Sequence, residues 1–405
     1  MNGKRLNLLL PPTAAALMLA ATPAAHATDH LVQEGTNWQF LAERLTPGDR
    51  IILMPGEHRP VSLSKLHGTA QRPITIMGVD PRNPSTIEAE RYGIRIEDLS
   101  HLHIRNLIIT GATIHGISLE AAWDPDADES ALPYDARRTV RLSNITVKNT
   151  GPQGLRHAIN LEHLSEIQIE DCRLEGWAGS GIELLGCTDV TIENSRFTGK
   201  QDHTQISGVR VRGGSDRVRI TNCRFENVGD QGVCIGGESD LEELRPKPAD
   251  DAQHGSLFEA ARVQVMRCVF KGSMCALAFV NCERSTVRNC TIHRPRRAVV
   301  SIRREQKDPR FGAVRYCTFG SNLIVWQPGD VARLAHVGKD VQDQDIGIDL
   351  EDNLWWSPDL EQTKQKLGAM PGNVLFPQVM NVDPELDDEL KPTEEQAKLF
   401  GAHAP

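Results

Sequence analysis

The stretch "SGIELLGCTDVTIENSRFTG" (residues 180–199) is closely followed by "SGVRVRGGSDRVRITNCRFEN" (residues 207–227). Each segment alternates apolar and polar residues, passes a turn of small residues, alternates again and ends on Asn-Ser-Arg-Phe or Asn-Cys-Arg-Phe. Alternation with a period of two is typical of β-strands that turn one face inward. Because the pattern repeats while the polar residues change, the inward face is the constrained feature.

The pattern small–apolar–x–apolar recurs along the chain at nearly regular steps. It appears as GIRI at Gly93, GISL at Gly116, AINL at Ala158, GIEL at Gly181, GVRV at Gly208, GVCI at Gly232, ALAF at Ala276 and VVSI at Val299. Five steps measure 23 to 27 residues, and the two longer ones hold insertions at residues 121–138 and 238–258. Units this short cannot bury an apolar face alone and must stack on their neighbours. The sequence therefore predicts an all-β fold, a single-stranded parallel β-helix (solenoid).

Both ends of such a coil need covers, since they expose apolar residues and strand edges. The segment "TNWQFLAERL" (residues 36–45) predicts a short amphipathic helix that caps the N-terminal end, with Trp38, Leu41 and Leu45 on one side. The repeat decays after Trp356. We therefore expect a capped β-helix over residues 28–356 and an irregular C-terminal cover over residues 357–405.

Residues 1–27 have the features of an export signal. Lys4 and Arg5 precede an apolar run that ends at an Ala-x-Ala cleavage site, Ala25 to Ala27. No other segment is apolar over a length that would cross a membrane. The prediction is a periplasmic or secreted protein, a monomer without a membrane partner.

The charge balance bears on the class of partner. The chain has 45 basic and 54 acidic residues, and removal of Lys4 and Arg5 leaves 43 − 54 = −11. This negative charge disfavours nucleic acid as the main partner.

Nine cysteines in an exported chain raise the question of disulfides. Their number is odd, and most belong to a column of small residues near the end of each unit. That column reads Cys172, Ser195, Cys223, Cys268, Cys290 and Cys317. Cysteine is common at fully buried positions, so the spacing predicts packed free thiols.

The chain resembles the right-handed parallel β-helix proteins of the pectin-lyase-like superfamily over nearly all of the expected mature protein. The segment "PGDRIILMPGEHRPVSLSKLHGTAQRPITIMG" (residues 47–78) is similar to the start of chondroitinase B and alginate lyase relatives. The resemblance implies a right-handed coil and a carbohydrate-active enzyme, and these relatives use Ca²⁺ with Lys and Arg. Their strand Glu-x-Ile-Arg-Ile-Gly is matched by "QGVCIGG" (residues 231–237) without the Glu and the Arg, so those roles are not carried over.

If the apolar residues point inward, the residues between them form two outward rows. The first row is Arg95, Ser118, Asn160, Glu183, Arg210, Cys234, Ala278 and Ser301. The second is Glu97, Glu120, Glu162, Leu185, Arg212, Gly236, Val280 and Arg303. Adjacent coils are about 4.8 Å apart, so neighbours in a row nearly touch.

Three side chains of these rows suggest a metal site. Asn160, Glu162 and Glu183 offer oxygen ligands within two coils, which suits Ca²⁺. Glu183 is also a candidate substrate-binding residue, although Glu183 and Arg210 equally suit an ordinary cross-strand ion pair.

Four residues near this row are candidates for catalysis. Arg210 and Arg212 can hold a carboxylate or sulfate through paired hydrogen bonds. The preceding turn supplies Lys200 and His203, either of which suits a proton acceptor. The alternative for these two is that they are solvated loop residues.

An arginine-rich run covers residues 284–315, with nine Arg and one Lys against two acidic residues. Such segregation in an acidic protein indicates a surface for a polyanion. Arg303 and Arg304 are its candidate substrate-binding members.

These features together favour a polysaccharide lyase that cleaves a uronate-containing chain by β-elimination. Taking a proton from the carbon beside a carboxylate requires that the negative charge first be neutralised, by Arg or a cation, and that a base lie nearby. A glycoside hydrolase that uses Glu162 and Glu183, a uronate epimerase and a non-catalytic polysaccharide-binding protein are the alternatives. In every case the expected partner is an acidic polysaccharide.

Overall fold

The computed structural model describes residues 27–122, 139–331, 333–339, 341, 346–358 and 383–404. The predicted export signal lies outside the described residues except for Ala27, and so does much of the predicted C-terminal cover. Within the described ranges, no helix is long and apolar enough to cross a membrane.

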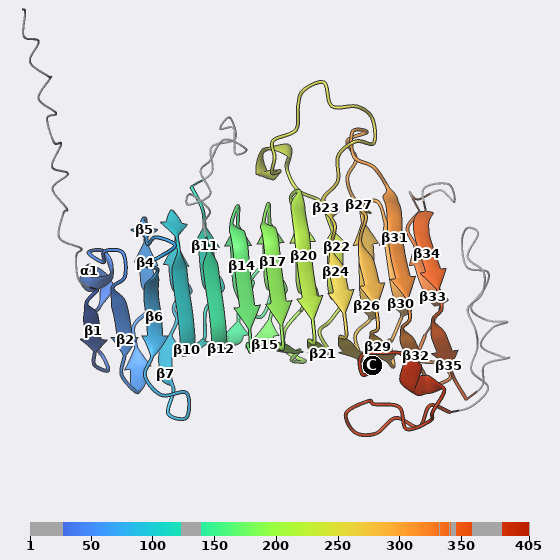
Figure 1. The fold of residues 1–405 in the computed structure, drawn as a ribbon, viewed down its shortest axis with the longest axis horizontal. Helices are drawn as coiled ribbons and strands as arrows, with labels where there is room; N and C mark the ends of the chain where they lie inside the picture. The colour runs from blue at the N-terminus through green and yellow to red at the C-terminus, as the bar shows by residue number, and fades with distance from the viewer. Residues whose placement is uncertain are drawn as a thin grey trace, which may run out of the picture.

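The chain winds into a long coil of parallel strands, stacked from one end of the molecule to the other (Figure 1). One side of the coil is a ten-stranded sheet, here called sheet B. In spatial order its strands are β4 (Val61–Leu63), β8 (Tyr92–Ile96), β11 (His115–Glu120), β13 (Ile159–Glu162), β16 (Ser180–Leu185), β19 (Ser207–Arg212), β22 (Gln231–Gly236), β26 (Cys275–Val280), β30 (Ala298–Arg303) and β33 (Arg333–Val337).

The rest of each coil belongs to a 23-stranded sheet, sheet A, which has two parts. In the first part lie β1 (Asp29–Val32), β2 (Arg50–Leu53), β6 (Ile74–Gly78), β10 (Leu102–Thr110), β12 (Val140–Thr150), β14 (Ser165–Glu170), β17 (Thr188–Glu193), β20 (Ser215–Thr221), β23 (Ala260–Ala261), β24 (Gln264–Met266), β27 (Cys282–Glu283), β28 (Thr286–Arg288), β31 (Val314–Gly320) and β34 (Ile346–Glu351). In the second lie β3 (Gly56–His58), β7 (Ser85–Glu88), β15 (Arg173–Trp177), β18 (Arg196–Thr198), β21 (Arg224–Glu226), β25 (Val269–Lys271), β29 (Thr291–His293), β32 (Leu323–Val325) and β35 (Leu354–Trp356), while β10 and β12 run through both. β5 (Leu66–His67) and β9 (Leu99–Ser100) form a separate pair.

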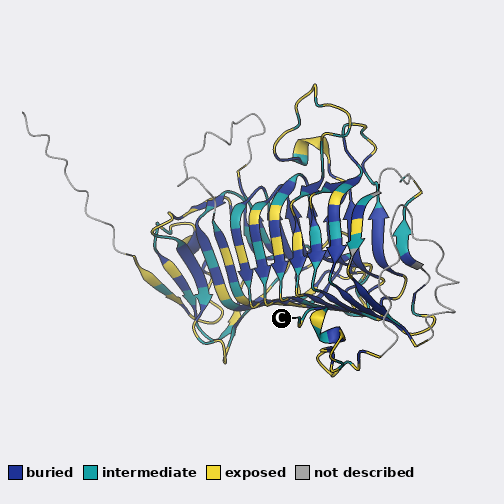
Figure 2. Ribbon diagram, turned by 45° about the vertical axis from the view of Figure 1, so that its right-hand side comes forward, coloured by how far each residue is buried: buried dark blue, intermediate teal, exposed yellow. Residues whose placement is uncertain are grey.

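The core confirms the predicted solenoid. Buried residues follow the whole length of the coil, and exposed residues alternate with them along many strands (Figure 2). At the centre, Phe197, Phe225 and Phe270 stack with ring centroids 4.5 and 4.8 Å apart. This stack explains why a small residue opens the repeat at Gly208. A Cβ there would lie 2.6 Å from Cδ1 of Phe225 and 2.5 Å from the backbone oxygen of Gly232, which is too close for either contact.

All nine cysteines are buried and free, as predicted. One assignment in their column is wrong. The register pairs Thr291 with Leu323, so the residue beside Cys290 is Asn322, whose side-chain oxygen accepts a hydrogen bond from the Cys290 amide at 2.9 Å. Cys317 belongs to a neighbouring column, next to Ser285. The prediction placed it beside Cys290 because the Cys-x-Phe sequence at Cys317 has the same spacing as the repeat.

The N-terminal cap is present but short. Helix α1 (Gln39–Ala42) follows Trp38, whose ring is buried and donates a hydrogen bond to the Arg59 carbonyl. Leu41 and Leu45 pack against the same core, as the pattern predicted.

The described part of the C-terminal segment packs on the side of the coil, next to β29, β32 and β35 (Figure 1). It includes the 3₁₀ helix η5 (Ala397–Leu399), and Ala397 and Phe400 cluster with Leu323 and Leu354. The segment thus covers apolar side chains on the outer surface of sheet A.

Candidate functional site

The outer face of sheet B carries the first predicted row in consecutive register. Ser118 pairs with Asn160, Asn160 with Glu183, Glu183 with Arg210, and Arg210 with Cys234. The row then continues through Ala278 and Ser301 to His336. The structure therefore brings Asn160, Glu183 and Arg210 together on three neighbouring strands.

Glu183 lies at the centre of a buried polar network. The residue is 1% exposed, and its Oε1 accepts a hydrogen bond from Arg212 Nε while its Oε2 accepts one from Ser180 Oγ, both at 2.6 Å. Burial alone would raise the pKa of this carboxyl, but the charges of Arg212 and Arg210 and the hydrogen bond from Ser180 hold the pKa below its usual value. Arg212 and Ser180 thus occupy both oxygens of Glu183, and its role in substrate binding stays a prediction.

Two histidines lie beside Glu183 and are neutral. The rings of His115 and His157 stack with centroids 5.0 Å apart, and Nδ1 of His157 accepts a hydrogen bond from the Ser180 amide at 2.9 Å. Burial lowers the pKa of His157, and it lowers the pKa of His115 to about 3. The 3.8 Å approach of His157 Nδ1 to Glu183 is therefore a contact between an acceptor nitrogen and a carboxylate, and Arg212 is the cation that balances Glu183.

These histidines predict an acid-sensitive fold. An unfolded chain takes up a proton at His115 near pH 6.5, whereas the folded protein does so only near pH 3. The unfolded state binds more protons in that window, so stability is lost as the pH falls through it. We expect the thermal midpoint to fall between about pH 7.5 and about pH 4.5, and to fall less in His115→Asn. An equal fall in variant and wild type, measured by calorimetry, would contradict this.

Arg212 connects sheet B to the insertion at residues 238–258. Besides Glu183, its guanidinium donates hydrogen bonds to Ser239 Oγ at 3.1 Å and to a carboxylate oxygen of Glu243 at 3.2 Å. Glu243 belongs to the 3₁₀ helix η3 (Leu241–Glu243) inside the insertion. Nε and Nη1 of Arg212 thus donate within the protein and anchor the insertion, and its role in the catalytic clamp stays a prediction.

A second anchor fixes the base of the insertion. Glu259 is fully buried and accepts hydrogen bonds from the backbone amides of Gly213 and Ser239, from Ser239 Oγ and from the Gln306 side chain, at 2.7 to 2.9 Å. Arg245 also donates a hydrogen bond to the His163 carbonyl. The insertion is thus tied to the edge of sheet B, where Figure 1 shows it rising above β20 and β23.

Arg210 differs from Arg212 although it lies on the same strand. Its Nε is buried without a hydrogen-bond partner among the described residues, and its Nη2 lies 3.9 Å from Glu305 Oε2. The same Glu305 approaches Arg303, with Oε1 3.3 Å from the arginine Nε. Two guanidinium groups therefore share one carboxylate, which leaves positive charge on this part of the face.

The residues predicted to bind calcium do not fit that ion. Asn160 turns its amide nitrogen toward Glu162 Oε1 at 2.7 Å, and both oxygens of Glu183 are occupied by Arg212 and Ser180. In the described ranges, no three His, Cys, Asp or Glu side chains form a group suited to a metal ion.

Lys200 and His203 lie on the loop that leads into β19. The Lys200 ammonium donates a hydrogen bond to the Asn149 side chain. His203 Nδ1 lies 2.8 Å from the Asp202 carboxylate, and its side chain is 6% exposed. The loop folds back over earlier coils, with the Thr204 amide bonded to the Pro152 carbonyl. No contact joins either side chain to Arg210.

The arginine-rich run does not form one continuous patch. Arg294 pairs with Asp330, and Arg310 with Asp308, on exposed or half-exposed positions. Arg304, predicted to bind substrate, instead donates to the Phe311 carbonyl at 3.4 Å. Arg303 is the last residue of β30 and lines a pocket on the outer face of sheet B.

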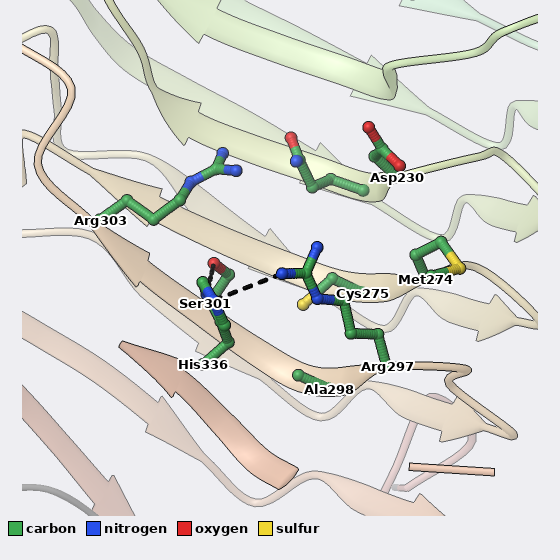
Figure 3. A pocket seen from close by; sticks show the side chains of 9 residues that line it. Asp230, Met274, Cys275, Arg297, Ala298, Ser301, Arg303 and His336 are labelled. Atoms are coloured by element: carbon green, nitrogen blue, oxygen red, sulfur yellow. Dashed lines mark hydrogen bonds between the residues drawn. The ribbon is translucent and has the colours of Figure 1, made fainter. Parts of the chain in front are cut away.

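A pocket of about 120 Å³ opens on the outer face of sheet B beyond Arg210. Figure 3 shows Arg297, Arg303, Ser301 and His336 around it, with Asp230 on the opposite side. Gln231, Met274, Cys275 and Ala298 complete the lining.

Sequence reasoning missed His157, Ser180, Gln231 and His336. Ser180 and Gln231 belong to a third outward row at the start of the sheet B strands, where Ser180 pairs with Ser207 and Ser207 with Gln231. The signal was present, because these residues lie three positions before Glu183 and Cys234 in the repeat.

Comparison with known proteins agrees with the fold. The family model described as a right-handed β-helix region matches residues 207–330. No match was found among curated proteins.

Three solved structures illustrate the likeness. An alginate lyase from Paenibacillus sp. str. FPU-7 is 14% identical with a TM-score of 0.51, over 81% of this chain and 95% of that chain. The A-module of an Azotobacter vinelandii mannuronan C-5 epimerase is 13% identical with a TM-score of 0.46, over 82% of this chain and 91% of that chain. A pectate lyase is 12% identical with a TM-score of 0.41, over 82% of this chain and 75% of that chain. At 14% identity the likeness to the Paenibacillus alginate lyase shows the fold alone.

Proposed function

We propose that this chain cleaves a uronate-containing polysaccharide by β-elimination on the outer face of sheet B. The observation that carries the proposal is Arg210, a guanidinium on that face whose Nε has no hydrogen-bond partner among the described residues and whose Nη2 lies 3.9 Å from Glu305. Arginine binds carboxylates through paired hydrogen bonds, so Arg210 suits the carboxylate of a uronate unit.

In the proposed step Arg210 neutralises the carboxylate and thereby acidifies the hydrogen on the adjacent carbon. A base removes this proton, the electron pair of the broken C–H bond forms a C=C bond, and the glycosidic oxygen departs and takes up a proton. Stabilising the charge that develops on the carboxylate is the largest contribution expected from the protein.

The base is His203 or Lys200, and the contacts of the two favour His203. Its Nδ1 lies 2.8 Å from an Asp202 carboxylate oxygen, an arrangement that orients an imidazole. Lys200 donates to Asn149, which fits a protonated ammonium. Substrate binding must close the gap between this loop and Arg210.

The two alternative enzymes, a glycoside hydrolase and a uronate epimerase, differ in how well they agree with the contacts of Glu183. A hydrolase that uses Glu162 and Glu183 needs two accessible carboxyl groups, one of them protonated. Glu183 is buried, ion-paired and of lowered pKa, so it suits neither role. A uronate epimerase begins with the same proton transfer as the lyase. Only the product, an intact chain with a changed uronate, distinguishes the two enzymes.

The comparisons support the proposal through the fold, which is shared with the solved Paenibacillus alginate lyase. A fold by itself does not determine a reaction. Export to the periplasm or medium, where polysaccharides are found, is part of the same proposal and rests on the signal in residues 1–27.

A direct test mixes the purified protein with alginate, chondroitin or pectate, with and without a chelator, and follows ultraviolet absorbance. A lyase creates an unsaturated product and absorbance rises, and a chelator-resistant rise is expected from the contacts of Glu183. New reducing ends without absorbance would establish a hydrolase. A changed uronate composition by NMR would establish an epimerase, and binding alone a non-catalytic protein; each of these three results overturns the proposal.

A further inference from the structure

The pocket beyond Arg210 is separate from the proposed reacting position. Its lining comes from β22, β26, β30 and β33 and the loops before them, whereas Arg210 is on β19. Neighbouring strands of a sheet are about 4.8 Å apart, so β30 and β33, at the far end of the pocket, lie about 14–19 Å from β19 along the coil. At its near end the side chain of Arg303 approaches Glu305, the carboxylate that Arg210 also approaches. A chain bound along sheet B would thus reach both positions at once.

Gln231 is the side chain in this pocket that most requires a ligand. It is 8% exposed, and its amide makes no hydrogen bond to the described part of the chain. Since an amide both donates and accepts, it matches a sugar hydroxyl.

Two arginines supply charge at the same place. Arg297 Nη2 lies 3.4 Å from His336 Nε2, and His336 Nδ1 lies 3.4 Å from Ser301 Oγ (Figure 3). Because arginine only donates, Nε2 accepts and the neutral ring donates from Nδ1 to Ser301. This chain of contacts orients Arg297 across the pocket, and Arg303 lies on the same side with only the shared Glu305 as a counter-charge.

We propose that this pocket is a second subsite that holds an acidic sugar unit of the same polysaccharide chain. Arg297 and Arg303 take its carboxylate or sulfate, while Gln231 and Asp230 take its hydroxyl groups. The inference rests on the proposed function for the identity of the ligand as an acidic polysaccharide. It adds that recognition needs at least two acidic units, separated by the distance from Arg210 to the pocket.

Titration calorimetry with oligosaccharides of defined length tests the subsite. The probes are alginate oligosaccharides of two and five units, with chondroitin sulfate oligosaccharides of similar lengths to separate carboxylate from sulfate recognition. In the wild type the longer member of the preferred series is expected to bind at least about tenfold more tightly, because it alone reaches both positions. Arg297→Ala and Gln231→Leu are expected to remove most of this advantage.

Arg294→Ala is the matched control, an arginine of the same run that pairs with Asp330 outside the pocket. It should keep the full length advantage. The thermal midpoint of Gln231→Leu should change little, since no hydrogen bond joins the Gln231 side chain to the described residues.

Two failures are distinguishable. If the pocket variants keep the length advantage while the wild type degrades the polymer, the subsite is wrong and the proposed function stands. If the wild type binds no oligosaccharide of either series and degrades no polymer, the proposed function fails, and the subsite with it.

Discussion

Arg210→Ala is expected to lower the rate of polymer cleavage roughly 100- to 1,000-fold, the effect of removing one preorganised group that stabilises developing charge. The thermal midpoint should be nearly unchanged, because Arg210 makes no close ion pair and its Nε has no partner to lose. Initial rates from product absorbance and a calorimetric scan of the same sample measure the two quantities together.

Arg219→Ala is the control for this change. Arg219 is an exposed arginine on β20, in sheet A, and has no place in the site. Arg210→Lys should recover only part of the activity, because lysine keeps the charge without the two parallel donors. A fully active Arg210→Ala protein would remove the proposed clamp.

The fold could be predicted from the sequence because the solenoid repeats its inward face. Ile182, Val209 and Val233 pair in register as the alignment of GIEL, GVRV and GVCI required. The same alignment placed Glu183 beside Arg210, since outward residues inherit the register of the inward ones. Cys317 was misplaced because a local Cys-x-Phe spacing reproduces the repeat without its register.

The role of each outward residue was less predictable, because it depends on what covers the face. Arg212 lies in a predicted row, yet its partners Ser239 and Glu243 come from an insertion outside the repeat. The pattern predicts which way a side chain points but not that an insertion folds over it. For the same reason the sequence predicted the same role for Arg210 and Arg212, whereas the structure gives the two side chains different contacts.

Arg212→Ala is expected to destabilise the protein by about 3–5 kcal/mol, the usual loss when one partner of a buried ion pair is removed. The change leaves Glu183, 1% exposed, without the guanidinium 2.6 Å from its Oε1, and it releases Ser239 and Glu243 of the insertion. A lower thermal midpoint and faster proteolysis within residues 238–258 are the expected readouts.

Adding Glu183→Gln to Arg212→Ala separates this explanation from a simple loss of packing. If the loss comes from the uncompensated carboxylate, the double variant should be more stable than Arg212→Ala alone, because the orphaned charge is gone while the cavity is unchanged. Arg217→Ala is the control, since its pair with Asp189 is roughly half exposed and should contribute less than about 1 kcal/mol. A double variant less stable than Arg212→Ala would mean that the arginine stabilises the coil through its packed stem and its contacts to the insertion, and that the charge of Glu183 is tolerated without it.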